Sequence, residues 1–399
     1  MTVRNGRQFL SIPGPTTVPD EVLAAMHRPA VDIYTGPLVG ITDSSLADLR
    51  RLFRTKGQPY IYIGNGHGAW EGALANVLSA GDTVLVLESG RFAAGWGQMA
   101  EAMGARVETV TGDQRRAVDP ALLEAHLRAD LLRKDKADRI KAILVVQVDT
   151  ASGVVNDIPA LRRAIDATGH DALFMVDAIA SLGTMEFEMD KWGVDVAVTC
   201  SQKGLMMPPG ISFAAAGPKA MAAHGEAGFR TRYWDWTERH GEEHYMKYCG
   251  TPPVQMLYGL RQSLDMLLAE GLENVFERHR LLAGAVHAAV AVWAEGGVLE
   301  FNITEPAERA PSVTTILTNG RDPAPLLDYC REKCGVVLGI AIGDLNGKGF
   351  RIGHMGHVNA PMLLGTLGVT ETALAALDIP HGRGGVQAAI DYLAGAVKP

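Results

Sequence analysis

The sequence predicts an α/β protein whose mainly parallel sheet is covered by helices on both faces. Short apolar runs are expected to form strands at 60–63, 83–87, 106–111, 141–147, 172–176, 196–198 and 211–215. Most of the segments between them have helical patterns, as at 69–78, 92–103, 120–133 and 157–167. Strands that alternate with helices require crossover connections, which produce a parallel sheet buried on both faces.

The C-terminal part of the chain predicts a smaller α+β domain. Strands are expected at 313–317, 336–340 and 349–352, and helices at 283–294, 323–333, 361–377 and 384–394. The segment Phe9–Pro19 contains three prolines and a glycine, which exclude a helix or a central strand; a helix is expected from about Asp20, with Asp20 as its cap. We therefore expect an extended N-terminal segment over 1–20, a large domain over 21–282 and a small domain over 283–399.

Composition narrows the class of protein. A net charge of -8 without a basic stripe argues against a nucleic-acid binder. The sequence contains no run of about 18 apolar residues, so we expect no membrane span. The first residues lack the apolar core of a signal peptide. Four cysteines in 399 residues imply no disulfide framework. We expect a protein of the cytoplasm, with no metal site.

Lys203 is the first candidate for chemistry. It follows the apolar strand at 196–198 on a turn that continues with Gly204. An amine at this place can be partly desolvated, which lowers its pKa and makes it a nucleophile able to form a Schiff base. A solvated surface lysine is the ordinary alternative, and the stretch alone does not exclude it.

Other candidates also lie at the carboxyl ends of predicted strands, where ligands bind in parallel sheets. The turn 64–68 is rich in glycine and precedes a helix, so it can cradle a phosphate. Phe92 can stack on a flat ring, Thr150 offers a hydroxyl, and Asp177 can neutralise a protonated ring nitrogen. Each residue also has an ordinary structural explanation. Together with Lys203, however, they suit one ligand, pyridoxal phosphate.

The chain resembles the class V branch of the fold-type I pyridoxal-phosphate aminotransferases, in particular the serine–glyoxylate and alanine–glyoxylate enzymes. The resemblance runs over nearly the whole chain. The stretches that carry it are Pro13-Gly-Pro-Thr16, Gly66-His-Gly-Ala-Trp-Glu71, Val176-Asp-Ala-Ile-Ala-Ser-Leu-Gly183, Ser201-Gln-Lys-Gly204, Thr251-Pro-Pro253, Leu272-Glu-Asn-Val275 and Arg351-Ile-Gly-His-Met-Gly356.

The resemblance implies a role for each matching residue. Lys203 would form the Schiff base and move the substrate proton, and Asp177 would hold the ring nitrogen. Arg351 would grip the substrate carboxylate, and Gly14 and Tyr34 would also bind the substrate. The remaining cofactor contacts would come from Phe92 and Thr150 at the ring, from Asn65, Gly66, His67 and Gln202 at the phosphate, and from Tyr248 and Thr251 of the neighbouring subunit. The resemblance thus implies a homodimer with shared active sites and a ping-pong transamination.

One stretch departs from the family's pattern. Glyoxylate-using relatives usually have Asp-His-Arg-Ser where this chain has Asp32-Ile-Tyr-Thr. A pyridoxamine–pyruvate aminotransferase of the same branch also lacks the His-Arg pair. Serine or alanine with glyoxylate is therefore the first expectation, and pyridoxamine with pyruvate is the alternative.

Two other chemistries have sequence signals. His240-Gly-Glu-Glu-His244 fits a zinc-hydrolase pattern, which requires a helix to bring both histidines to one face. This helix is not expected, because the stretch 229–248 is aperiodic and predicts a long functional loop. A cysteine desulfurase would need a cysteine on a mobile loop, whereas Cys330 and Cys334 lie at the end of a helical pattern.

Overall fold

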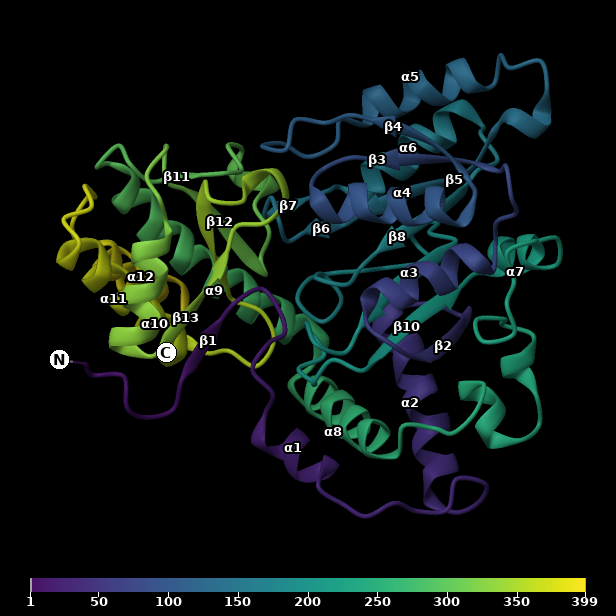
Figure 1. Ribbon diagram of the computed structural model, residues 1–399, viewed down its shortest axis with the longest axis horizontal. Coiled ribbons are helices and arrows are strands. Elements are labelled where there is room, and N and C mark those ends of the chain that lie inside the picture. Colours follow the sequence, from purple (N-terminus) through teal and green to yellow (C-terminus); the bar gives the residue numbers. More distant parts are fainter. Residues whose placement is uncertain (1, 399) are drawn as a thin grey trace.

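The computed structural model describes residues 2–398, which form a large and a small part side by side (Figure 1). The large part is built on a seven-stranded sheet with the order β2–β10–β9–β8–β5–β3–β4. Its strands are β2 (Gln58–Ile63), β3 (Thr83–Leu87), β4 (Arg106–Val110), β5 (Ile140–Val146), β8 (Leu173–Asp177), β9 (Val196–Cys200) and β10 (Ile211–Ala216). This is the α/β architecture that the strand and helix pattern predicts.

The sheet is mainly parallel, with one exception. β10 pairs antiparallel with both β9 and β2, while β3, β4, β5, β8 and β9 pair in parallel. Only residues 201–210 separate β9 from β10. A parallel crossover needs a dozen or more residues, so this connection forces a reversal of direction. The reversing segment is the one that contains Lys203.

Helices bury both faces of the large sheet. They are α1 (Asp20–Met26), α2 (Pro37–Phe53), α3 (Gly66–Ala75), α4 (Arg91–Met103), α5 (Pro120–Asp130), α6 (Ile158–Thr168), α7 (Pro218–His224) and α8 (Val254–Glu270). Alternate residues of β5 enter different cores: Ile143 and Val145 pack with α2, α5 and α6, whereas Ala142 and Leu144 pack with α3 and α4. This period of two is the geometry of a strand, and it explains why the strands are apolar throughout.

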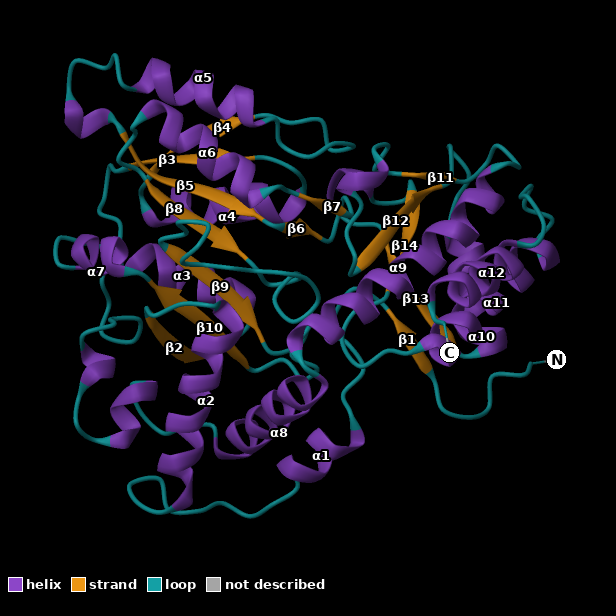
Figure 2. Cartoon of the chain, turned by 180° about the vertical axis from the view of Figure 1, so that it is seen from behind, coloured by secondary structure: helices purple, strands orange, loops and turns teal. Residues whose placement is uncertain are grey.

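The small part has its own sheet and core (Figure 2). Its strand order is β1–β13–β14–β12–β11, with β1 (Phe9–Ser11), β11 (Glu300–Phe301), β12 (Val313–Leu317), β13 (Val336–Ile340) and β14 (Gly349–Gly353). Its helices are α10 (Ala324–Cys334), α11 (Ala360–Ala376) and α12 (Gly385–Ala396). Helix α9 (Leu272–Ala294) joins the two parts: Val275 packs in the large core and Leu282 in the small one.

The N-terminal segment differs from its prediction in two details. Residues 9–11 are extended as expected, but they add edge strand β1 in parallel to β13 of the small sheet. Asp20 is the first residue of α1 rather than its cap, because Pro19 occupies the cap position and Asp20 pairs with Arg7 at 3.0 Å. Helix α2, which begins at Pro37, was not predicted from the sequence.

Within residues 2–398, no helix combines the length and apolar character needed to cross a membrane. The aromatic stretch 229–248 is irregular, as predicted, and contains two short 3₁₀ turns, η2 (Glu238–His240) and η3 (His244–Tyr248). A short hairpin, β6 (Val148–Asp149) and β7 (Val154–Val155), follows β5.

Candidate active site

A cavity of about 210 Å³ lies at the carboxyl ends of β5, β8 and β9. This is the edge of a parallel sheet at which ligands bind. Nine of the predicted site residues line this cavity: Gly14, Asn65, Gly66, His67, Phe92, Thr150, Asp177, Gln202 and Lys203.

Lys203 is held on the turn after β9 by the N-terminal segment. Its Nζ donates a hydrogen bond to the carbonyl of Pro13, and the hydroxyl of Thr16 donates to the carbonyl of Lys203 at 3.0 Å. Burial lowers the pKa of the Lys203 ammonium group, with Arg351 adding to the effect. The amine is therefore closer to its neutral, nucleophilic form than a solvated lysine would be.

Gly14 lets the N-terminal segment pass close to this amine. Its φ of +115° is favourable only for glycine, and a Cβ at this position would overlap the end of the Lys203 side chain. The predicted substrate residue Gly14 is thus a place of close approach between the segment and the amine.

Asp177 ends β8 at the floor of the cavity and is 2% exposed. The backbone N–H of Ile179 donates to Oδ1 at 2.6 Å, and the indole N–H of Trp70 donates to Oδ2 at 2.7 Å. Burial raises the pKa of Asp177 to about 7, although both hydrogen bonds oppose that rise. The carboxyl group is thus partly ionised near neutral pH, and in that form it can accept a hydrogen bond from a protonated ligand.

The glycine turn forms the start of α3, with Asn65 at the cap. Oδ1 of Asn65 accepts hydrogen bonds from the backbone N–H groups of His67 at 3.1 Å and Gly68 at 3.3 Å. Two of the donors expected to face an anion are therefore already bonded to this side chain. The helix end and the ring of His67, which faces the indole of Trp70 at 4.7 Å between centroids, remain beside the cavity.

Phe92 is placed by a residue that sequence reasoning missed. Asp149 is fully buried, and its Oδ2 accepts hydrogen bonds from the backbone N–H groups of Phe92 at 2.8 Å and Ala93 at 3.1 Å. Asp149 thereby caps α4 from the neighbouring hairpin. Its place directly before Thr150, at the end of a buried strand, is the signal that could have identified it.

Arg351 reaches toward the large part from β14 and is 7% exposed. Its Nε donates to the carbonyl of Ile340 at 2.7 Å, and Nη1 donates to the carbonyl of Thr150 at 2.8 Å. Burial lowers its pKa to about 10, which leaves it protonated at neutral pH. A guanidinium has five N–H donors, so one on Nη1 and two on Nη2 remain available for a carboxylate.

Besides Arg351, which approaches the cavity through Thr150, three predicted site residues are not among those that line it. Tyr34 is 60% exposed and contacts Tyr245 edge-to-face at 5.9 Å. Tyr248 is 1% exposed, and its hydroxyl shares a hydrogen bond of 2.7 Å with Thr42, so it could reach another subunit only by leaving that position. Thr251, in contrast, is exposed on the surface of the chain.

The zinc alternative does not agree with the structure. His240 and His244 lie in separate 3₁₀ turns and bond Tyr60 at 2.9 Å and Thr42 at 2.8 Å, respectively. Within residues 2–398, no group of three or more potential ligands is placed to hold a metal. The desulfurase alternative fails as well: Cys330 is buried on α10, and burial raises the pKa of its thiol to about 12.

Comparisons with known proteins agree with this geometry. The sequence model of the family "Aminotransferase class-V" matches residues 47–343. The chain is 38% identical to a serine–glyoxylate aminotransferase of Methylorubrum extorquens, covering 98% of this chain and 97% of the relative. It is 36% identical to an L-aspartate–glyoxylate aminotransferase of Paracoccus denitrificans, with 96% and 95% covered. The structure of a pyridoxamine–pyruvate aminotransferase from Mesorhizobium loti superposes with a TM-score of 0.90 at 26% identity and covers 100% of both chains.

Proposed function

We propose that this chain, which belongs to the class V aminotransferase family and is a pyridoxal-phosphate-dependent transaminase, moves the amino group of a small amino acid to glyoxylate by a ping-pong mechanism. The observation that carries the proposal is the presence of Lys203 and Asp177 on one cavity of about 210 Å³. The names of the serine–glyoxylate and aspartate–glyoxylate relatives support glyoxylate as the acceptor.

The residues around the cavity fit pyridoxal 5'-phosphate. The group requires an amine for its aldehyde and a carboxylate for its ring nitrogen, and Lys203 and Asp177 offer both. Among the described residues, the amide oxygen of Gln202 is buried without a hydrogen-bond partner, so no protein donor fixes this amide, and its NH₂ group would be the end that faces a phosphate. When bound, the cofactor supplies an electron sink for the charge that develops at the substrate's α-carbon.

Lys203 and Asp177 divide the work in this proposal. Lys203 would hold the cofactor covalently and would move a proton at the substrate's α-carbon as base and acid; its lowered pKa suits both tasks. Asp177 keeps the ring nitrogen protonated by accepting its hydrogen bond. Phe92 would cover the ring, Thr150 would bond the ring hydroxyl, and the phosphate would be held by Asn65, Gly66, His67 and Gln202.

Arg351 orients the substrate. Its free N–H groups can bind the α-carboxylate of the amino acid in the first half-reaction and that of the oxo acid in the second. One site for both carboxylates is what a ping-pong mechanism requires, because the two substrates occupy the cavity in turn.

The assembly and the location are parts of the same proposal. A homodimer would bring Thr251 of the neighbouring subunit to the phosphate and Tyr34 to the substrate, and the exposure of Thr251 and Tyr34 supports this arrangement. Tyr248 would join the phosphate only after leaving its buried hydrogen bond with Thr42. The four free cysteines support a reducing compartment such as the cytoplasm.

Pyridoxamine with pyruvate is the second candidate. The structure from Mesorhizobium loti superposes over the full length of both chains. The stretch Asp32-Ile-Tyr-Thr also lacks the His-Arg pair that is usual in the glyoxylate enzymes. Both observations concern the substrate rather than the cofactor, so the two candidates share Lys203 and Asp177.

A substrate panel tests the proposal. The purified holoenzyme is assayed with serine, alanine, aspartate or pyridoxamine as donor, each against glyoxylate and pyruvate. We expect a small amino acid with glyoxylate to give a kcat/KM at least about tenfold above that of pyridoxamine with pyruvate. The reverse order would select the second candidate. Lys203→Ala is the control for the chemistry: undiminished turnover, or an unchanged visible band of the bound cofactor, would contradict both.

A further inference from the structure

Trp70 is the aromatic centre of the layer beneath the cavity. It lies in α3 and is 1% exposed. Its indole stacks on Trp96 with centroids 6.0 Å apart at 17°, and it meets the rings of His67 at 4.7 Å and Phe92 at 6.3 Å. Neighbours on several sides thus fix the plane of the indole, and with it the direction of the N–H group.

That N–H group points at the one carboxylate on the cavity floor. Trp70 Nε1 lies 2.7 Å from Oδ2 of Asp177, while the backbone N–H of Ile179 holds Oδ1 at 2.6 Å. Trp70 and Asp177 both line the cavity. Each carboxylate oxygen has two lone-pair sites, so Asp177 can accept both donors and still accept a third from a ligand.

We propose that Trp70 is a positioning residue of this aminotransferase: its indole N–H fixes the carboxylate of Asp177 and stabilises the ionised form that binds the ring nitrogen of pyridoxal phosphate. The inference rests on the proposed role of Asp177. The function itself needs only a carboxylate at that place; the inference adds that this carboxylate depends on the indole.

The physical basis is the balance of burial and hydrogen bonding at Asp177. Burial disfavours the charged carboxylate, and the donors of Ile179 and Trp70 oppose that effect, leaving its pKa at about 7. Removal of one donor raises the pKa further. A larger fraction of Asp177 is then protonated at neutral pH and cannot neutralise a protonated ring.

Trp96 provides a matched control. It is 0% exposed, belongs to the same aromatic layer and stacks on Trp70. Among the described residues its Nε1 has no hydrogen-bond partner. Tryptophan to phenylalanine therefore removes the same atoms at both positions, but only at position 70 does it remove a hydrogen bond to Asp177.

The test measures cofactor affinity of the apo-protein against pH. Pyridoxal phosphate is titrated into wild type, Trp70→Phe, Trp96→Phe and Asp177→Asn, and binding is followed by quenching of protein fluorescence. We expect the acidic midpoint of the affinity profile to move up by about one to two pH units in Trp70→Phe. At pH 7 its affinity should fall roughly tenfold. Ionisation of the ligand is common to all four proteins and cancels in the comparison.

The outcomes separate the inference from the function. The positioning role is overturned if the acidic midpoint of Trp70→Phe equals that of wild type, or if Trp96→Phe shows an equal shift. In either case, weakened binding by Asp177→Asn would leave the proposed role of Asp177 intact. Binding by Asp177→Asn that matches wild type at every pH instead overturns the proposed role of Asp177. Thermal unfolding of both phenylalanine variants reports whether packing alone explains a difference.

A second measurement needs no substitution at Trp70. The chain contains six tryptophans, so an apo-protein labelled with ¹⁵N at the indole gives few N–H resonances. One of them should titrate with a midpoint near 7, the pKa of Asp177, and should stop titrating in Asp177→Asn. If no indole resonance follows Asp177, the hydrogen bond is absent in solution and the inference is wrong, whether or not Trp70→Phe folds.

Discussion

Asp149 orients the residues of the site although it does not line the cavity. It is fully buried and ties the backbone of Phe92 and Ala93 to the hairpin that carries Thr150. A side chain at Gly90 would collide with its carboxylate, since a Cβ there would lie 2.5 Å from Cγ of Asp149. Two predicted cofactor contacts, Phe92 and Thr150, are thus fixed relative to each other by one residue that sequence patterns did not single out.

Arg351 gives a prediction at the same scale. We expect Arg351→Lys to raise KM for both the amino acid and the oxo acid, roughly 10- to 100-fold, with a smaller change in kcat. Lysine keeps the charge but loses the planar fork that binds a carboxylate through two parallel hydrogen bonds. Steady-state kinetics with each substrate varied in turn measure the two values of KM separately.

Arg309→Lys is the control for Arg351→Lys. Arg309 also donates from Nε to a backbone carbonyl, that of Ile303 at 3.0 Å, but its guanidinium stacks on Phe301, whereas that of Arg351 bonds Thr150 at the cavity. Arg309→Lys should therefore leave both values of KM near those of wild type. If Arg351→Lys raised KM for only one of the two substrates, the result would contradict a shared carboxylate site.

At the scale of elements, the sequence predicted the strands of the large sheet because their apolar runs are uninterrupted and lie between glycine or polar turns. It also placed Lys203, Asp177 and Thr150 at one edge, since the carboxyl ends of neighbouring parallel strands meet there. Helix α2 was missed: its segment follows Gly36 directly and mixes apolar and polar residues, and only packing on α8 and β2 shows its buried face. The direction of β10 follows from loop length, not from composition.

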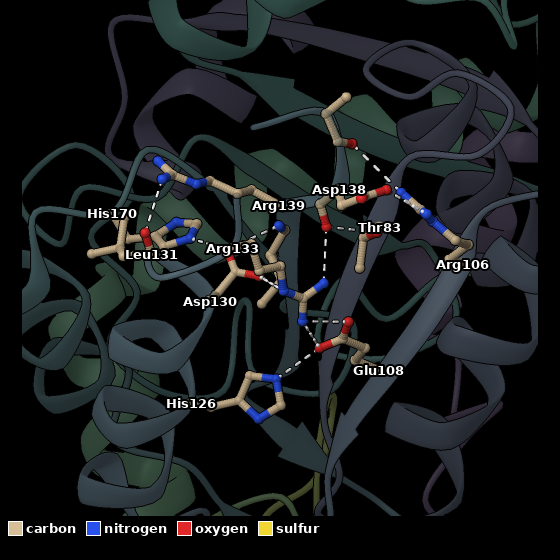
Figure 3. A network of polar contacts seen from close by, with 12 residues as sticks. Thr83, Arg106, Glu108, His126, Asp130, Leu131, Arg133, Asp138, Arg139 and His170 are labelled. Carbon is tan, nitrogen blue, oxygen red and sulfur yellow. Dashed lines mark hydrogen bonds and ion pairs between the residues drawn. The ribbon is translucent and has the colours of Figure 1, made fainter. Parts of the chain in front are cut away.

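A polar network supports the edge strand β4 (Figure 3). Glu108 accepts hydrogen bonds from Arg133 at 2.6 Å and shares one with His126 at 2.9 Å; Arg133 also pairs with the buried Asp130, which bonds His170 at 2.8 Å. Burial raises the pKa of Glu108, but the hydrogen bonds of Arg133 and His126 outweigh burial and lower it overall. Glu108 therefore contributes its ion pairs to the edge only while it is ionised.

This gives a prediction for the pH dependence of stability. Because the pKa of Glu108 is lower in the folded than in the unfolded chain, its contribution is complete above the unfolded value of about 4.3 and is lost as pH falls through the folded value. Glu108→Gln should cost about 1 kcal/mol at pH 7. The difference from wild type should vanish in strong acid. Thermal midpoints of the two proteins across pH measure it.

Glu124→Gln is the control for Glu108→Gln. Glu124 pairs with Arg128 one turn along α5 at an exposed place, where such pairs contribute little. The thermal midpoint of Glu124→Gln should stay close to that of wild type at every pH. A deficit of Glu108→Gln that persists unchanged into strong acid would show that shape, rather than charge, explains its effect.

At the scale of the whole molecule, the site draws on segments far apart in the chain. Gly14 and Arg351 come from the segment after β1 and from β14 of the small sheet, whereas Asp177 ends β8 and Lys203 follows β9 of the large sheet. The predicted boundary at 282–283 falls inside α9, which serves both cores. Periodicity could not predict that Arg351 reaches Thr150, because a contact between separate sheets leaves no local pattern. The family resemblance indicated only that both residues belong to the site.

Of all the features proposed, the homodimer is the one for which the structure of a single chain gives the least evidence. Thr251 makes it testable. If each site combines Lys203 of one subunit with Thr251 of the other, then Lys203→Ala and Thr251→Asp should each inactivate, the latter because a carboxylate repels the phosphate. After unfolding and refolding together, half of the dimers are mixed, and each mixed dimer contains one intact site. We expect recovery of about a quarter of the wild-type activity.

Refolding each variant alone is the control and should give no recovery. Recovery in the mixture cannot arise from sites confined to one chain, since neither chain then holds both intact residues. Continued inactivity of mixtures that contain mixed dimers, verified by differently tagged chains, would show that Thr251 serves the site of its own subunit. The exposure of Thr251 would then need another explanation, and the homodimer would have to be argued from surfaces other than the stretch that contains it.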